Sequence, residues 1–177
     1  ILTNLLPDAE LTVREGLPNI YCGLISVMLF FCFLFCRRIS ARKKILNCAM
    51  LAFLLLSLNW NKLDFLWHGL HFPNQLPYRY SFVVSFLLVS LAYEAYLHLR
   101  EASFKQLAGI AAGIAVYMLL AEKLSSDKLK PEFIYAGLFL LLVYTAFLCV
   151  YRTGKQKEAL MGFLLLMIVC AELHKSR

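Results

Sequence analysis

Charged residues are scarce in this sequence, and long stretches have almost none. Asp, Glu, Lys and Arg make up 16% of the 177 residues, whereas soluble domains have about 25%. Hydrophobic residues make up 61% of the chain, and the mean hydropathy is +0.69. These values exclude an ordinary soluble domain. The alternating pattern of membrane β-strands is also absent, so the apolar segments are expected to be helical.

The apolar residues are concentrated in six runs, each with at most one charged residue. About 20 helical residues cross a hydrocarbon core of roughly 30 Å, and backbone groups inside lipid must be hydrogen-bonded within their own segment. The sequence therefore predicts an all-α polytopic transmembrane helix bundle of about six helices. The expected spans are 18–36, 45–59, 81–97, 104–121, 132–151 and 159–173, of which the second is short. Because the sequence opens on Ile and stops soon after its last run, we expect residues 1–177 to be one membrane segment of a longer protein.

Acidic residues are outnumbered by basic ones, which gives a net charge of +7. The excess is concentrated between alternate runs: loop 37–44, RRISARKK, has five basic residues and no acid, and YRTGKQKE (151–158) and LREASFK (99–105) are also basic. Basic loops stay in the cytoplasm, so loop 37–44 is predicted to be cytoplasmic and loop 60–80 extracytoplasmic. The charge thus sets orientation in the membrane, and no nucleic-acid partner is expected.

Cysteine pairs with the spacing CxxC are absent. The six cysteines lie in or at the ends of apolar runs, where Cys usually acts as a small apolar filler, so neither a disulfide nor a cysteine metal site is expected. The spacing of Gly109 and Gly113 is the G-x-x-x-G pattern, which lets a neighbouring helix approach closely. We interpret it as ordinary bundle packing.

Polar and aromatic residues are concentrated in loop 60–80, which includes the stretch WHGLHFPNQLPYRYSF from Trp67 to Phe82. On a helix over Trp60–Phe72, an apolar stripe and a polar stripe lie side by side. The polar stripe consists of Asn61, Asp64, His68 and His71. Tryptophans at both ends of such a helix favour the membrane–water interface. Pro73 and Pro77 would then end the helix and form a turn with Asn74.

Several kinds of ligand fit this loop. Asp64, His68 and His71 have a spacing compatible with a divalent metal ion, although interfacial histidines often bond only to headgroups or backbone. Arg79 suits a phosphate, or it anchors the chain at the headgroups or pairs with Asp64. Asn, His and aromatic side chains together also suit a sugar. No cofactor is identified, and the metal alternative stays open.

Two acids lie inside apolar runs, where ionisable residues are functional candidates by default. Glu94 and Glu172 both lie near the ends of their expected spans. There they can reach an interface, so we interpret both as structural.

The stretch WHGLHFPNQLPYRYSFVVSFLLVSLAYEAY resembles the characteristic loop and helix of the YfhO family of bacterial membrane proteins. GLPNIYCG before the first run and the basic RRISARKK loop are similar to the same family. The resemblance covers most of residues 16–98, whereas the later runs match it in hydropathy and order.

The resemblance implies a function. The family consists of long polytopic proteins of Gram-positive bacteria that are similar to GT-C glycosyltransferases and are linked to glycosylation of lipoteichoic acid. The expected donor is a polyprenyl-phosphate-linked sugar, and the acceptor is lipoteichoic acid or a similar envelope glycopolymer. The catalytic acid of GT-C enzymes lies in a first outer loop, which is expected upstream of this segment in the parent chain. The residues expected to contact substrate are Arg79, His68, Asn74, Tyr78, Asp64 and His71.

Two other functions remain open. A lipid or solute transporter would need ionisable residues at mid-membrane and broken helices there, whereas charges in this sequence lie mainly at helix ends. A structural membrane segment without catalytic residues would tolerate substitution throughout loop 60–80.

Overall fold

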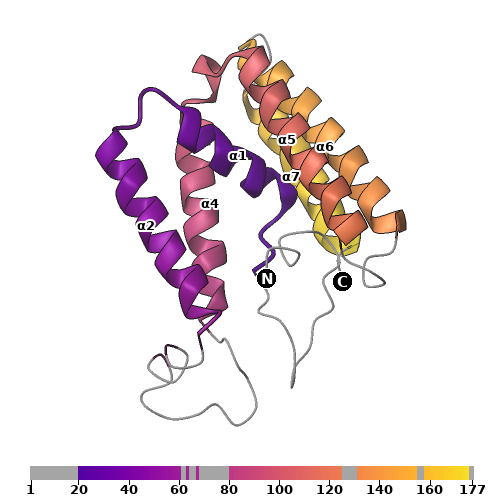
Figure 1. Cartoon of the computed structure of the whole chain (residues 1–177). Helices are drawn as coiled ribbons and strands as arrows, with labels where there is room; N and C mark the ends of the chain where they lie inside the picture. Colours follow the sequence, from indigo (N-terminus) through magenta and orange to yellow (C-terminus); the bar gives the residue numbers. More distant parts are fainter. Residues whose placement is uncertain are drawn as a thin grey trace.

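The protein is a bundle of helices (Figure 1). The computed structural model describes residues 20–60, 63, 67, 80–124, 131–154 and 158–175. All regular secondary structure in these residues is helical, so the predicted all-α bundle is confirmed. The helices are α1 (Leu24–Phe35), α2 (Ala41–Ser57), α4 (Ser81–Leu97), the 3-10 helix η2 (Leu99–Glu101), α5 (Phe104–Leu124), α6 (Pro131–Arg152) and α7 (Glu158–Lys175).

Among the described residues, two helices are long and apolar enough to cross a membrane by themselves. They are 20 residues of α5 (Phe104–Lys123) and 19 residues of α6 (Ile134–Arg152). The helices α1 and α4 and the segment Leu160–Glu172 of α7 are apolar but shorter. The fold is therefore a bundle of long and short apolar helices, consistent with a membrane location.

Helix α1 is shorter than the expected span 18–36. It begins at Leu24 and has 12 residues, which extend about 18 Å at 1.5 Å per residue and cannot cross a 30 Å core alone. Gly23 has φ 86° and ψ 140°, a backbone conformation close to a region that only glycine occupies readily. The helix cannot continue through this residue toward the N-terminus, so the prediction of its start was wrong.

Helix α1 lies at the centre of the bundle and is inclined to its neighbours (Figure 1). It packs chiefly against α4 and also contacts α5 and α6. Its buried side chains include Met28 and Phe33, both with no exposed surface. They share one core with Val84 of α4 and Tyr144 of α6. The α2–α4 pair therefore lies on one side of α1, and α5, α6 and α7 lie on the other.

Two helix starts follow from local sequence. Ser40 caps α2, since its side chain accepts a hydrogen bond from the Lys43 backbone N–H at 3.4 Å. Ser103 and Gln106 form a reciprocal capping box before α5. The Ser103 Oγ accepts from the Gln106 N–H at 3.1 Å, and the Gln106 Oε1 accepts from the Ser103 N–H at 2.8 Å. These caps fix where both helices leave their loops.

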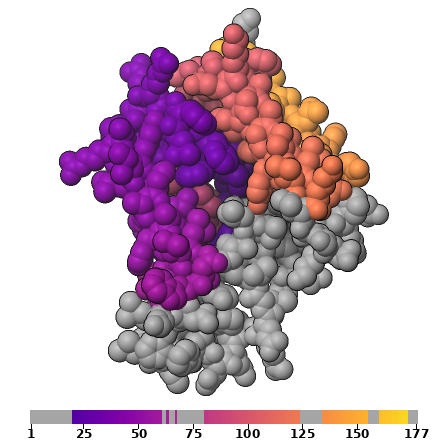
Figure 2. All heavy atoms as spheres, in the orientation of Figure 1, coloured from indigo at the N-terminus to yellow at the C-terminus, as the bar shows by residue number. Residues whose placement is uncertain are grey.

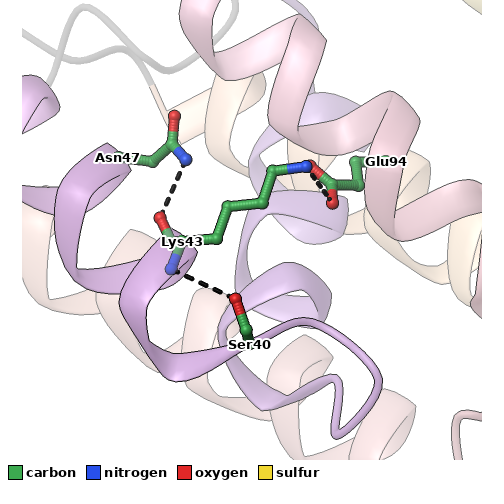
Figure 3. Close-up of polar contacts among 4 residues, drawn as sticks. All are labelled: Ser40, Lys43, Asn47 and Glu94. Carbon is green, nitrogen blue, oxygen red and sulfur yellow. Dashed lines mark hydrogen bonds and ion pairs between the residues drawn. The ribbon is translucent and has the colours of Figure 1, made fainter.

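One end of the bundle, here called the Arg38 end, is crossed by ion pairs. Lys43 Nζ lies 2.7 Å from Glu94 Oε1 (Figure 3), and Arg38 Nε lies 3.0 Å from Glu101 Oε2. Exposed pairs of this kind contribute little stability, but they place loop 36–40 beside the end of α4 and η2. The two basic segments concerned, 37–44 and 99–105, were predicted to lie on the same side of the membrane. The ion pair with Lys43 agrees with the structural role that was predicted for Glu94.

The opposite end is here called the Trp60 end. Helices α2 and α7 end there, and α4 begins there (Figure 1). The chain thus alternates between the two ends, as the charge pattern predicts.

The G-x-x-x-G pattern does not have the predicted packing role in the described part of the chain. Gly109 and Gly113 are exposed on α5, and a Cβ built on either would have no neighbouring atom within 4 Å. The small residues are instead on the wall of a groove described below.

Replacement of Gly23 by Ala tests the origin of the short α1. We expect Gly23→Ala to lower the free energy of unfolding by about 1–3 kcal/mol, because Ala is strained at this φ. Thermal unfolding of the full-length protein in detergent measures the effect. The matched control is Gly162→Ala in α7, which has open space around it and gains helix propensity. Equal melting temperatures for Gly23→Ala and wild type would contradict the assignment.

Candidate functional site

The start and the end of loop 60–80 are held together at the Trp60 end. The Tyr80 hydroxyl donates a hydrogen bond to the Ser57 carbonyl oxygen at 2.7 Å. Trp67 stacks on the Tyr80 ring, with centroids 5.0 Å apart and planes 17° apart. Tyr80 is 6% exposed, so its contacts are part of the core. The loop therefore leaves α2 and enters α4 from a fixed base.

Few residues of the expected interfacial helix are described, so its position at the interface stays a prediction. Leu63 and Trp67 are helical, and the Leu63 N–H donates to the Trp60 carbonyl oxygen at 2.9 Å. The two tryptophans are 58% and 45% exposed. Indole rings exposed at a bundle end suit the membrane–water interface.

The predicted substrate-contacting residues lie outside the described residues. The nearest described residues in sequence are Leu63, Trp67 and Tyr80. Their predicted roles stay predictions, and so does the alternative of a metal ion on the polar stripe. The residues concerned are Arg79, His68, Asn74, Tyr78, Asp64 and His71. Within the described ranges, no three His, Cys, Asp or Glu side chains lie close enough to hold a metal ion.

A buried carboxylate forms a second polar centre near the Trp60 end. Glu172 of α7 is only 2% exposed. Its Oε1 accepts hydrogen bonds from the Leu24 backbone N–H at 2.8 Å and from the Tyr21 hydroxyl. Its Oε2 accepts from the Tyr144 hydroxyl at 2.6 Å. One side chain thereby joins the segment before α1, the start of α1, α6 and α7.

The Glu172 side chain also interacts with the start of α1. The first N–H groups of a helix carry partial positive charge and lack hydrogen-bond acceptors inside the helix. Glu172 supplies an acceptor for the first N–H group of α1, that of Leu24. A Cβ at Gly23 would lie 3.6 Å from Glu172 Oε2, an ordinary van der Waals contact, so it is the positive φ of this residue that favours glycine. Both oxygens already have donors, so the group positions helices and has little capacity left to bind a ligand.

Only part of this centre could be predicted from sequence. An acid inside an apolar run marks a candidate, and its interpretation as structural agrees with the three hydrogen bonds. The partners Tyr21 and Leu24 are far from Glu172 in sequence, with separations of 151 and 148 residues. No periodicity or motif indicates such a distant contact.

A double-mutant cycle tests whether Glu172 and Tyr144 act together. We expect Glu172→Gln to lower the free energy of unfolding by about 1–3 kcal/mol, since an amide NH₂ would face buried donors. Combined with Tyr144→Phe, the loss should be less than the sum, with a coupling energy of about 0.5–3 kcal/mol. Thermal unfolding of the full-length protein supplies the values. Tyr93→Phe, at a 63% exposed tyrosine of α4, serves as the control and should add independently. If the losses from Glu172→Gln and Tyr144→Phe are additive, the hydrogen bond between these two side chains contributes nothing to stability.

Comparison with known proteins gives one match. The family described as "Bacterial membrane protein YfhO" matches residues 2–176. No curated protein and no solved structure matches the chain. The match covers nearly the whole sequence and extends the resemblance in residues 16–98 to the later helices. This chain therefore belongs to the YfhO family of bacterial membrane proteins.

Proposed function

We propose that the chain is the membrane portion of a GT-C-like glycosyltransferase. The enzyme would move a sugar from a polyprenyl-phosphate donor to a cell-envelope acceptor such as lipoteichoic acid. The observation that carries the proposal is the anchored base of loop 60–80, where Tyr80 bonds to Ser57 and stacks on Trp67. These contacts join the two ends of a sequence segment that is rich in His, Asn, Tyr and Arg.

The residues of the loop suit the two parts of such a donor. Aromatic faces and the His68 and Asn74 side chains can bind a sugar by stacking and hydrogen bonds. Arg79 can bind a phosphate through its planar fork. When the sugar leaves the phosphate, negative charge develops on the phosphate oxygen, and a fixed cation stabilises that charge. The prenyl tail would lie between helices.

The general base is proposed to come from another part of the parent chain. An acceptor hydroxyl must lose a proton as it attacks the sugar, and a carboxylate placed beside it can accept that proton. Glu172 is poorly suited to this role, because it is buried and both of its oxygens accept hydrogen bonds from the protein. Its proposed role is to hold the helices that support the site.

The proposed location of the site is the extracytoplasmic face of the membrane. The basic loop 37–44 assigns the Arg38 end to the cytoplasm by the positive-inside rule. The Trp60 end, with loop 60–80, then faces outward, where a lipid-linked sugar and lipoteichoic acid are both accessible.

A structural membrane segment is the second candidate. The Glu172 contacts favour it, since they serve packing. A transporter has less support, because the described ion pairs, Lys43 with Glu94 and Arg38 with Glu101, lie at the Arg38 end rather than at mid-membrane.

Substitution of Arg79 separates an enzyme site from architecture. We expect Arg79→Ala in the full-length protein to reduce sugar transfer to lipoteichoic acid at least about tenfold, since a charged hydrogen bond of 1.5–3 kcal/mol is lost. Transfer is measured in membranes with matched protein abundance. Arg42→Ala, at an exposed position of α2, is the matched control. Unchanged transfer by Arg79→Ala would make Arg79 an interfacial anchor and loop 60–80 part of the architecture.

A further inference from the structure

Two adjoining cavities lie near α1 and α5, away from loop 60–80. Figure 2 shows the face on which α1 and α5 are both visible. The first cavity, the Arg37 pocket, has a volume of about 350 Å³ and opens at the Arg38 end. The second, the α1–α5 groove, has a volume of about 700 Å³. Both volumes are within the range of ligand sites, about 300–1,000 Å³. They share Phe35, Gln106 and Ile110 on their walls, so they lie directly beside each other.

The lining of the Arg37 pocket is mainly apolar, and several polar and basic groups lie among its residues. His98, Ser103 and Gln106 contribute polar groups to its lining, and Arg37 lies at its edge. Glu101 also lines it, but its carboxylate pairs with Arg38 at 3.0 Å. The partially positive first turn of α5 begins beside the pocket, after Ser103. The pocket is therefore complementary to an anion.

The α1–α5 groove is apolar along its length and basic at one mouth. Its α1 wall is formed by Leu24, Val27, Phe31 and Phe35. On α5 it is lined every fourth residue by Lys105, Gly109, Gly113 and Tyr117, together with Ile110 and Ile114. The two glycines deepen the groove because they add no side chain. Lys105 is exposed at the mouth nearest the Arg37 pocket. In the described part of the chain, neither Lys105 nor Arg37 forms an ion pair.

The length of the groove indicates a lipid chain rather than a helix. Its α5 wall extends from Lys105 to Tyr117, about 18 Å of helix at 1.5 Å per residue. A single leaflet contributes about half of the 30 Å hydrocarbon core, so the groove matches the depth of one leaflet. A membrane-crossing helix would need a contact surface that continues through the other leaflet.

We propose that the Arg37 pocket and the α1–α5 groove together bind one anionic glycerophospholipid. Its phosphate lies in the pocket near Arg37 and Lys105, and an acyl chain lies along the groove over Gly109 and Gly113. The phosphate-binding part of the site is at the Arg38 end, whereas the proposed sugar-transfer site is at the Trp60 end. The lipid site does not depend on the sugar-transfer function.

Lipid binding to the full-length protein in detergent tests the proposal. Native mass spectrometry measures the affinities for phosphatidylglycerol and for phosphatidylcholine with the same acyl chains. We expect wild type to prefer phosphatidylglycerol. The double variant Arg37→Gln/Lys105→Gln should lose at least about tenfold in phosphatidylglycerol affinity, since it loses hydrogen bonds to a charged group. Its affinity for phosphatidylcholine should be unchanged.

Matched variants control for general effects. Arg42→Gln/Lys123→Gln removes two exposed basic charges outside both cavities and should retain the preference. Gly113→Leu fills the groove and should weaken binding of both lipids, whereas Gly162→Leu places the same side chain on α7 and should not. If Gly113→Leu fails to fold, the charge variants still decide the outcome.

Two results would overturn the proposal. One is equal affinity for both lipids in wild type and in the Arg37→Gln/Lys105→Gln variant. The other is a Gly113→Leu variant that retains lipid but shifts a dimer to monomer, because the groove would then hold a helix of a second copy.

Discussion

The hydrogen bonds of the Glu172 carboxylate determine much of the arrangement of this bundle. Helix α7 packs chiefly against α6, and the carboxylate adds a direct connection to the start of α1 and to Tyr21. Helix α1 begins at this contact and is inclined between α4 and α5 (Figure 1). Its residues from Leu24 to Phe35 form one wall of the α1–α5 groove. The buried acid thus joins the start of α1 to α6 and α7, and the groove extends from there toward the other end.

The two ends of the bundle have different chemistry. At the Trp60 end, aromatic and uncharged polar contacts hold the base of loop 60–80, which suits the recognition of a sugar. At the Arg38 end, basic side chains and ion pairs surround a pocket that suits a phosphate. Charge of this kind is expected where a membrane protein meets the anionic cytoplasmic leaflet. The two proposals, sugar transfer and lipid binding, thus concern opposite ends of one bundle.

Sequence patterns were most informative where local chemistry determines structure. Helix α4 occupies the predicted residues 81–97, and α5 begins at Phe104 as expected, where a capping box starts it. The start of α1 was mispredicted because it depends on Gly23 and on Glu172, which lies 148 residues beyond Leu24. The role of Gly109 and Gly113 was mispredicted because the G-x-x-x-G pattern shows only that close approach is sterically allowed. The candidate residues from Asp64 to Arg79 rest on sequence and resemblance.

Side-specific thiol labelling tests most directly which end of the bundle faces the cytoplasm. Single cysteines would be introduced at Asn74 in loop 60–80 or at Thr153, an exposed turn residue after α6, in an otherwise cysteine-free full-length protein. A membrane-impermeant maleimide should label the Asn74→Cys variant in intact cells and the Thr153→Cys variant only after permeabilisation. Labelling of Thr153→Cys in intact cells, with Asn74→Cys protected until permeabilisation, would contradict the orientation and place loop 60–80 in the cytoplasm.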